Sequence, residues 1–433
     1  MSISCPALMI SAPASGQGKT MVTAALARQH RMAGRRVRVF KCGPDFLDPM
    51  ILEQASGAPV HQLDLFMCGE QECRRLLHDA AQEADIILVE GVMGLFDGCP
   101  SAADLAARFG LPVLAVVDGS AMAQTFGAVV HGLHTYRSDV RVVAALGNRV
   151  GSERHAAMLA RSLPQSVAWF GALPRDELAA LPERHLGLVQ ASEIADIATR
   201  IERAASHLST EAMWLPPPVP FAASAGEPAQ PLLAGKCIAV ARDAAFSFIY
   251  PANLSCLKSL GAQVSFFSPL ADASLPECDA VWLPGGYPEL HLGVLTANHA
   301  MHRAIHAHFI AGKPILAECG GMLYCTEELA ANDGTNAAML GLMPGKAMVH
   351  RRLAALGLQA IASGPDTLRG HTFHYSTLET PLVPFAKARN PEGQPGEAVW
   401  RNGSLTATYV HLYFPSSPRT TAAIFSPQCT GER

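Results

Sequence analysis

The sequence predicts two doubly wound α/β domains in series, because three features of the chain agree. Its 433 residues exceed what one hydrophobic core usually holds. Short continuous apolar runs alternate with helical stretches, which is typical of parallel strands covered by helices on both faces. A proline-rich segment separates two such series. We therefore expect a first domain at residues 1–210, a linker at 211–234 and a second domain at 235–433.

The expected strands are the apolar runs that end in a glycine turn or a polar residue. In the first domain they are Ala7–Ala12, Val37–Lys41, Asp85–Glu90, Pro112–Asp118 and Val140–Asn148. Helices are expected between them, for example at Thr20–Ala33 and Ala121–Leu133. The strands expected in the second domain, before a later β-rich stretch, are Cys237–Arg242, Gln263–Phe267, Ala280–Leu283 and Pro314–Ala317.

The composition excludes several classes of protein. With 49% apolar and 16% charged residues, the chain can form well-packed cores. A net charge of −4 gives no electrostatic reason to expect a nucleic-acid or membrane surface. The N-terminus lacks a basic segment before its short apolar run, so we expect a strand there rather than a signal peptide. The 11 cysteines show no regular pairing, which predicts reduced thiols and a cytoplasmic protein.

A phosphate-binding loop is predicted between the first strand and the first helix. Residues 11–20 read SAPASGQGKT, and small residues at this place let backbone N–H groups surround phosphate oxygens. Gly16 and Gly18 would shape the loop. Lys19 would neutralise the β- and γ-phosphates, and the Thr20 hydroxyl would bind Mg²⁺. Pro13 occupies the place of the first glycine in the usual P-loop pattern.

Four acidic residues follow the second and third strands, at the edge of the sheet where ligands bind. Asp45 and Asp48 lie in the loop after the second strand, within FKCGPDFLDP. Glu90 ends the next strand, and Asp97 follows it in a loop bracketed by glycines. A single acid in such a place is commonly a helix cap. Four together predict the binding of a metal ion and a substrate.

Cys319 is the one cysteine in the setting of a nucleophile. The segment LAECGGM places it between an apolar strand and a glycine turn that leads into a helix. Such a turn lifts the side chain out of the sheet. The N–H groups at the start of the helix are expected to favour thiolate over thiol. Taken alone, a cysteine beside a Gly-Gly turn is more often a buried core thiol, so the assignment depends on the rest of the chain.

Over essentially its whole length the chain resembles the cobyrinate a,c-diamide synthases, glutamine-dependent amide ligases of corrin biosynthesis. The segments that carry the resemblance, in order, are SAPASGQGKT, FKCGPDFLDP, LVEGVMGLFDG, GNRVG, RDAAFSFIYPANL, WLPGGYPEL, AECGGM and HTFHYS. The resemblance implies a P-loop ATPase domain similar to dethiobiotin synthetase, joined to a class I glutaminase domain of the cobalamin-synthase type.

Roles in the first domain follow from the resemblance by matching each motif. It assigns ATP to Gly16, Gly18, Lys19 and Thr20, Mg²⁺ to Thr20, Asp45 and Glu90, and the corrin carboxylate to Asp48 and Asp97. Asn148 and Arg149, just past a strand, correspond to a pair that contacts the base or the phosphates. For Asn148, a left-handed turn residue is an equally good interpretation.

In the second domain the resemblance implies a cysteine–histidine pair. Cys319 would attack the glutamine carboxamide, release ammonia and leave a thioester that water hydrolyses. The amides of Gly320 and Gly286 would stabilise the oxyanion. His411, at a late strand end in TYVHLY, would be the base.

Three positions depart from the family pattern. Phe46 stands where the family often has tyrosine, so no hydroxyl role is assigned there. Tyr413 stands where many class I glutaminases have a glutamate that orients the histidine, and the third member of the relay is therefore unassigned. Thr372 replaces the acid of a segment that often reads HEFHYS, so no function is assigned to that segment.

The resemblance implies ATP, glutamine and a corrinoid polycarboxylate as partners, and it leaves a homodimer open. A polyanionic substrate predicts a basic surface near the Asp48 and Asp97 loops that includes Arg149 and Arg175. Cobyric acid synthase and nickel-sirohydrochlorin a,c-diamide synthase are alternatives. A third alternative is a nucleotide-switched regulatory ATPase with an inactive glutaminase domain. Against it, Ala14 occupies the position of the signature lysine of partition ATPases. Cobalt-bearing and metal-free rings are both open.

Overall fold

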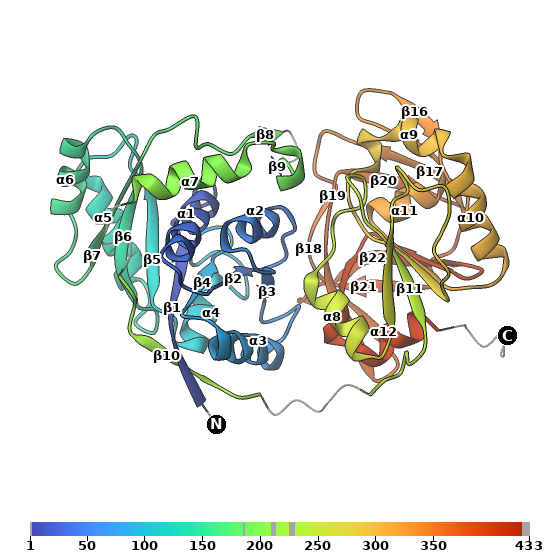
Figure 1. The fold of residues 1–433 in the computed structure, drawn as a ribbon, viewed down its shortest axis with the longest axis horizontal. Coiled ribbons are helices and arrows are strands. Elements are labelled where there is room, and N and C mark those ends of the chain that lie inside the picture. The colour runs from blue at the N-terminus through green and yellow to red at the C-terminus, as the bar shows by residue number, and fades with distance from the viewer. Residues whose placement is uncertain (1, 185–186, 209–213, 225–229, 427–433) are drawn as a thin grey trace. The chain divides into compact units, whose positions relative to one another are not determined.

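The structure is a computed structural model that describes residues 2–184, 187–208, 214–224 and 230–426. The chain forms two compact units, Met1–Gly226 and Glu227–Arg433. Figure 1 shows each unit as a sheet with helices on its faces. The division lies inside the segment 211–234 that the sequence analysis treats as a linker.

The first unit is built on a parallel sheet with the strand order β3-β2-β4-β1-β5-β6-β7. Its strands are β1 (Ser2–Ser11), β2 (Val37–Cys42), β3 (His61–Leu63), β4 (Ile86–Glu90), β5 (Val113–Asp118), β6 (Val142–Val150) and β7 (Ala168–Pro174). Its helices are α1 (Lys19–Met32), α2 (Leu47–Ser56), α3 (Glu70–Glu83), α4 (Ala102–Phe109), α5 (Thr125–Thr135), α6 (Glu153–Arg161) and α7 (Ile197–His207). Two short strands, β8 (Glu183–Arg184) and β9 (Gly187–Leu188), pair with each other.

The expected linker contains a strand of the first unit. β10 (Pro218–Ala222) pairs antiparallel with β1, from Ser2↔Ala222 to Pro6↔Pro218. Val219 and Phe221 are buried, whereas Pro218, Pro220 and Ala222 are exposed. This alternation is that of a strand with one covered face, and an edge strand tolerates proline. The expected linker therefore includes a paired strand at residues 218–222, which its proline content does not indicate.

The second unit begins with the predicted alternation. It contains β11 (Cys237–Ala241), α8 (Pro251–Ser259), β12 (Gln263–Phe267), β13 (Ala280–Leu283), α9 (Leu292–Ala297), α10 (His299–Ile310), β14 (Ile315–Glu318) and α11 (Gly320–Cys325). The four strands are parallel, in the order β12-β11-β13-β14. Their residues alternate between two cores. Val281 and Leu283 face one core, and Ala280 and Trp282 face the other. Burial on both faces explains the continuous apolar runs.

The rest of the second unit is a β-rich half whose pairing the sequence did not reveal. Its elements are β15 (Thr326–Ala330), β16 (Asn336–Ala338), β17 (Met343–Val349), β18 (Ala355–Ser363), β19 (Asp366–His374), β20 (Ser376–Glu379), β21 (Ala386–Arg389), β22 (Pro395–Asn402), β23 (Leu405–Thr408), β24 (His411–Tyr413) and α12 (Pro418–Ile424). The order β14-β23-β22-β21-β18-β19-β24 extends the main sheet, while β15, β16, β17 and β20 form a second one. Within the described residues, no helix combines the length and apolar character needed to cross a membrane.

Candidate active sites

The phosphate-binding loop predicted from SAPASGQGKT lies between β1 and α1. Gly18 precedes α1 with φ +86°, and a Cβ there would lie 2.2 Å from Nδ2 of Asn148. Only glycine satisfies both conditions. The buried Lys19 ammonium donates to the carbonyl oxygens of Ala14, at 3.2 Å, and Met93, at 2.6 Å. The loop is therefore wrapped closely around its own lysine, as a P-loop requires.

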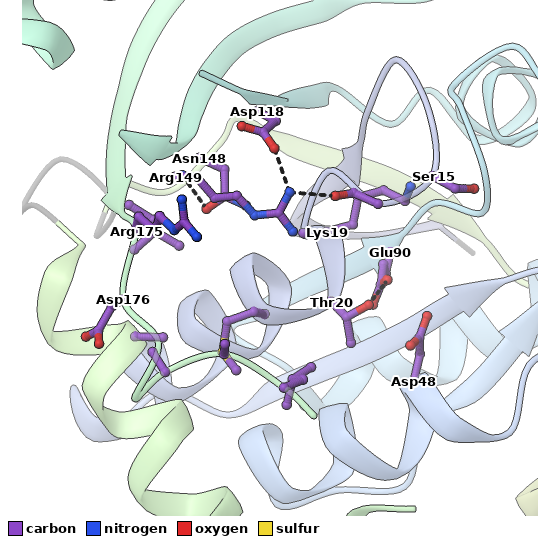
Figure 2. Close-up of a pocket in the computed structure, with 18 of the residues that line it drawn as sticks. Ser15, Lys19, Thr20, Asp48, Glu90, Asp118, Asn148, Arg149, Arg175 and Asp176 are labelled. Carbon is purple, nitrogen blue, oxygen red and sulfur yellow. Dashed lines mark hydrogen bonds and ion pairs between the residues drawn. The ribbon is translucent and has the colours of Figure 1, made fainter. Parts of the chain in front are cut away.

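Asn148 and Arg149 brace this loop from β6. Nδ2 of Asn148 donates to the carbonyl oxygen of Gln17 at 2.8 Å. Nη1 of Arg149 donates to the carbonyl oxygen of Gly16 at 3.0 Å and pairs with Asp118 at 2.5 Å, as Figure 2 shows. The left-handed conformation considered for Asn148 belongs to Arg149, whose φ is +56°. Both side chains contact the loop, so they stabilise its conformation independently of any contact with a ligand.

Lys41 lies at the centre of the predicted acidic cluster, although no motif in the sequence predicted its role. Its ammonium is 2.5 Å from Asp48, 2.9 Å from Glu90 and 3.8 Å from Asp45. The side chain is only 3% exposed. Burial opposes the charge, but the three carboxylates hold the pKa of Lys41 well above its ordinary value. A lysine at the end of an otherwise apolar strand, one strand away from the phosphate loop, is the signal that could have revealed it.

Glu90 links this cluster to the phosphate loop. Oγ1 of Thr20 donates to Oε1 of Glu90 at 2.9 Å (Figure 2). Burial raises the pKa of Glu90 to about 7, against the effect of Lys41. Its second oxygen, Oε2, is buried and makes no hydrogen bond to any described residue. A buried carboxylate oxygen of this kind suits a cation, and the oxygen donors here suit Mg²⁺.

The metal residues do not form a ready-made cage. Across the described residues, no group of three or more acidic, histidine or cysteine side chains is arranged to hold a metal ion. Lys41 instead contacts Asp45 and Glu90, two of the three predicted ligands. Mg²⁺ bound with a nucleotide usually takes only one or two carboxylates and completes its shell with phosphate oxygens and water, so the two observations are compatible.

A cavity of about 810 Å³ joins these groups within the first unit. Gly16, Gly18, Lys19, Thr20, Lys41, Asp45, Asp48, Glu90, Asn148, Arg149 and Arg175 line it, together with residues from Leu173 to Leu181 and from α7. Figure 2 labels Lys19, Thr20, Asp48, Glu90, Asn148, Arg149 and Arg175 among the residues that line this pocket. The predicted substrate residue Asp97 is not among the lining residues. It is exposed, and its carboxylate accepts the Gly94 N–H at 2.9 Å.

Cys319 occupies the sharp turn between β14 and α11 that the sequence predicts. Its φ of +44° and ψ of −109° are strained for a residue with a side chain. The Cys319 N–H donates to the Thr408 carbonyl at 2.8 Å, which fixes the turn to the end of β23. A Cβ on Gly320 would lie 2.9 Å from the nitrogen of Gly286, so the two predicted oxyanion residues are packed backbone against backbone.

The thiol is not activated by the helix as expected. Burial, followed by the charge of Glu289, raises the pKa of Cys319 far above its ordinary value, and the Gly320 N–H only partly opposes this. The helix α11 has 6 residues, so its dipole is small. The expectation of a resting thiolate is therefore wrong, and the thiol needs a base or a bound substrate to lose its proton.

His411 lies against the same glycine turn. A Cβ on Gly285 would come within 2.3 Å of Cε1 of His411, so the ring abuts the turn that also contacts Gly320. His411 stacks on His371, with ring centroids 4.9 Å apart and an angle of 20° between the rings. Burial, with the charges of His371 and His374, keeps the pKa of His411 well below its ordinary value. The imidazole is therefore neutral at neutral pH and able to accept a proton.

A buried glutamate connects the two predicted catalytic residues. Glu318 precedes Cys319 and accepts hydrogen bonds from the Leu412 N–H and from Nε1 of Trp282, both at 3.0 Å. Leu412 directly follows His411, so one carboxylate ties the nucleophile's strand to that of the base. Burial raises the pKa of Glu318 to about 8. The role of Glu318 could not be predicted from the sequence, because a backbone partner 94 positions away leaves no local signal.

Comparisons with known proteins identify the two domains. Residues 8–189 match the CobQ/CobB/MinD/ParA nucleotide binding domain, and residues 237–419 match the CobB/CobQ-like glutamine amidotransferase domain. The chain is 60% identical to a hydrogenobyrinate a,c-diamide synthase of Stutzerimonas stutzeri, over 98% of this chain and 99% of the relative. It is 59% identical to a hydrogenobyrinate a,c-diamide synthase of Pseudomonas aeruginosa, over 98% of each chain. It is 51% identical to a cobyrinate a,c-diamide synthase of Herminiimonas arsenicoxydans, over 97% of each chain.

The chain belongs to the a,c-diamide synthase family. The family predicted from the sequence is thereby confirmed, and so is the architecture of a nucleotide-binding domain followed by a glutamine amidotransferase domain. A member of this family is a glutamine-hydrolysing carbon–nitrogen ligase, which argues against the regulatory ATPase.

Proposed function

We propose that the enzyme converts the a- and c-acetate carboxylates of hydrogenobyrinic acid to amides, using ATP and glutamine. The observation that carries this proposal is the full-length similarity to two hydrogenobyrinate a,c-diamide synthases at 60% and 59% identity. The relative at 51% identity is named for cobyrinate, so the cobalt-bearing ring is the second candidate.

The first domain activates the carboxylate in this scheme. A carboxylate is a poor electrophile, and transfer of the γ-phosphoryl group of ATP to it gives an acyl phosphate with a good leaving group. Lys19 reduces the repulsion between the anionic acetate and the phosphates. Thr20, Asp45 and Glu90 would hold Mg²⁺, which supplies further neutralisation of phosphate charge. Asp48 would act close to the corrin acetate, while Lys41 keeps the carboxylates of the cluster in place.

The second domain supplies the nitrogen. His411 accepts the thiol proton while Cys319 attacks the glutamine carboxamide, and the amides of Gly286 and Gly320 stabilise the oxyanion. His411 returns this proton to the leaving nitrogen, so collapse releases ammonia and leaves a γ-glutamyl thioester, which water hydrolyses to glutamate and the free thiol. Ammonia then attacks the acyl phosphate and displaces phosphate. Because the product carries two amides, the cycle runs twice.

Two variants test this division of labour. Cys319→Ser should abolish synthesis from glutamine but retain synthesis from ammonium salts at high pH, where unprotonated ammonia is present. Lys19→Ala should abolish synthesis from either nitrogen source. Synthesis by Lys19→Ala, or loss of both routes in a folded Cys319→Ser protein, would contradict the scheme. Comparing turnover of the metal-free and cobalt-bearing rings, with product mass as the readout, decides the substrate and separates the enzyme from cobyric acid synthase.

The cellular setting is also part of the proposal. All ten cysteines in the described residues are free thiols, which supports the prediction of a cytoplasmic enzyme. The domain boundaries, the homodimer and the lack of nucleic-acid or membrane partners stay predictions of the sequence.

A further inference from the structure

The surroundings of Cys319 contain more acid than thiol chemistry needs. Three carboxylates, those of Glu289, Glu397 and Glu318, each oppose ionisation of the thiol. A site that must form a thiolate gains nothing from negative neighbours unless they serve the substrate. Glutamine brings a positive group of its own, the α-ammonium, into this site. A carboxylate that binds this cation needs an oxygen that is not already engaged.

Glu318 and Glu289 are already engaged. Both oxygens of Glu318 accept hydrogen bonds, and the residue is only 1% exposed. Glu289 has an interaction of its own within the described chain. Glu318 therefore has no open acceptor oxygen.

Glu397, on β22, contacts other side chains through only one of its two carboxylate oxygens. Its Oε1 accepts a hydrogen bond from Oγ1 of Thr372 at 3.2 Å and lies 3.1 Å from Nε2 of His374. Oε2 makes no hydrogen bond to any residue the structure describes. The side chain is 16% exposed, so it is fixed in direction but reachable. Thr372 stands where the family segment often has an acid, and Glu397 brings a carboxylate to that place from β22, a strand that does not pair with β19.

A rigid chain of contacts connects Glu397 to the nucleophile. The His374 ring stacks on the Tyr409 ring, with centroids 3.7 Å apart and planes within 9° of parallel. The Tyr409 hydroxyl accepts a hydrogen bond from Oγ of Ser376 at 3.2 Å. Tyr409 directly follows Thr408, whose carbonyl accepts the Cys319 N–H. The acid therefore has a fixed position relative to the turn that carries the thiol.

We propose that Glu397 binds the α-ammonium of glutamine through Oε2, while Thr372 and His374 hold Oε1. The inference rests on the proposed glutaminase role of Cys319 and adds a residue that selects the substrate. It also gives the acid a function in the reaction. The bound ammonium neutralises a carboxylate that otherwise raises the pKa of Cys319, so glutamine itself eases formation of the thiolate.

The test compares two alkylating agents on the full-length enzyme. The chloroketone analogue of glutamine, 2-amino-4-oxo-5-chloropentanoic acid, carries the α-ammonium, whereas iodoacetamide is neutral and carries none. Modification of Cys319 is followed by mass spectrometry. Glu397→Gln should lower the rate of Cys319 alkylation by the chloroketone about tenfold or more, the usual effect of losing a charge-assisted hydrogen bond. The rate of alkylation by iodoacetamide should be unchanged or higher. The KM for glutamine should rise by a similar factor.

Glu392→Gln is the matched control, because Glu392 is an exposed glutamate in the turn that leads into β22. It should behave as the parent enzyme in both reactions. Thr372→Val, which keeps Glu397 but removes one of its donors, should shift the same selectivity by a smaller factor. This second variant tests the proposal even where Glu397→Gln does not fold.

Equal slowing of both reagents in Glu397→Gln would show a merely structural role and overturn the inference, as would an unchanged chloroketone rate. If the proposed glutaminase role of Cys319 were wrong, a different result would be seen. Cys319→Ser would then still hydrolyse glutamine, irrespective of the residue at position 397.

Discussion

Replacing Lys41 by methionine should destabilise the enzyme strongly, and more at pH 8 than at pH 5. Lys41 is 3% exposed, and its ammonium lies within 4 Å of three carboxylates, at 2.5, 2.9 and 3.8 Å. Removing one partner of a buried ion pair costs about 3–5 kcal/mol, because the other charge is left without compensation. Total stabilities are only about 5–15 kcal/mol, so urea unfolding should detect this loss easily.

The pH dependence follows from Glu90. Its folded pKa of about 7 lies above its ordinary value of 4.5, so its protonated form is favoured by folding. This contribution is fully present below pH 4.5 and is lost as the pH rises through 7. Without Lys41 the folded pKa rises further, so the variant should lose most stability above neutral pH and recover part of it near pH 5. Adding Glu90→Gln should make the double variant more stable at pH 8 than Lys41→Met alone.

Arg36→Met is the control for this experiment, because it breaks an ion pair with Asp85 whose side chains are 69% and 40% exposed. Its stability should show no such pH dependence. An equal loss at pH 5 and pH 8 in Lys41→Met would refute the reasoning, since the cost would then come from lost packing rather than from unpaired carboxylates. Lys41→Met should also lose amide synthesis, whether glutamine or ammonia is the nitrogen source.

Three further predictions concern the two sites. Gly18→Ala should remove nucleotide binding, measured by calorimetry, because its Cβ would lie 2.2 Å from Asn148 in a left-handed conformation, while glutamine hydrolysis remains. His411→Ala should lose glutamine hydrolysis by at least about 100-fold, as expected for a general base, and keep synthesis from ammonia; loss of both routes would contradict its assignment. Glu318→Ala should lower kcat for glutamine more than it raises KM, because it leaves the Leu412 N–H beside His411 without its acceptor. A change in KM alone would contradict this positioning role.

Local patterns predicted the parallel strands and the residues at their ends. The glycine turns before α1 and α11 are short and sequential, so SAPASGQGKT and AECGGM could be placed correctly without a structure. Strand ends at one sheet edge also brought Asp45, Asp48 and Glu90 together as expected, since carboxyl ends of parallel strands meet there.

What the sequence could not predict depends on contacts between distant segments. Lys41 looked like part of a strand, and its three acidic neighbours become visible only when β2 and β4 pair. Glu397 lies 25 positions from Thr372, and only the pairing of the antiparallel half brings them together. The state of the Cys319 thiol was mispredicted for a related reason. Burial by surrounding elements outweighs the short helix that the local sequence reveals.

The pairing of β10 with β1 has a practical consequence for separating the two halves of the enzyme. A recombinant fragment cut at residue 210, where the sequence suggests an end, would lack the strand that covers β1. The open N–H and C=O groups of Ser2–Pro6 would then offer a template for association with other chains, and the apolar contacts of Val219 and Phe221 would be gone. A fragment that continues through residue 224 keeps that edge paired, so it should avoid the edge-to-edge aggregation expected of the shorter one.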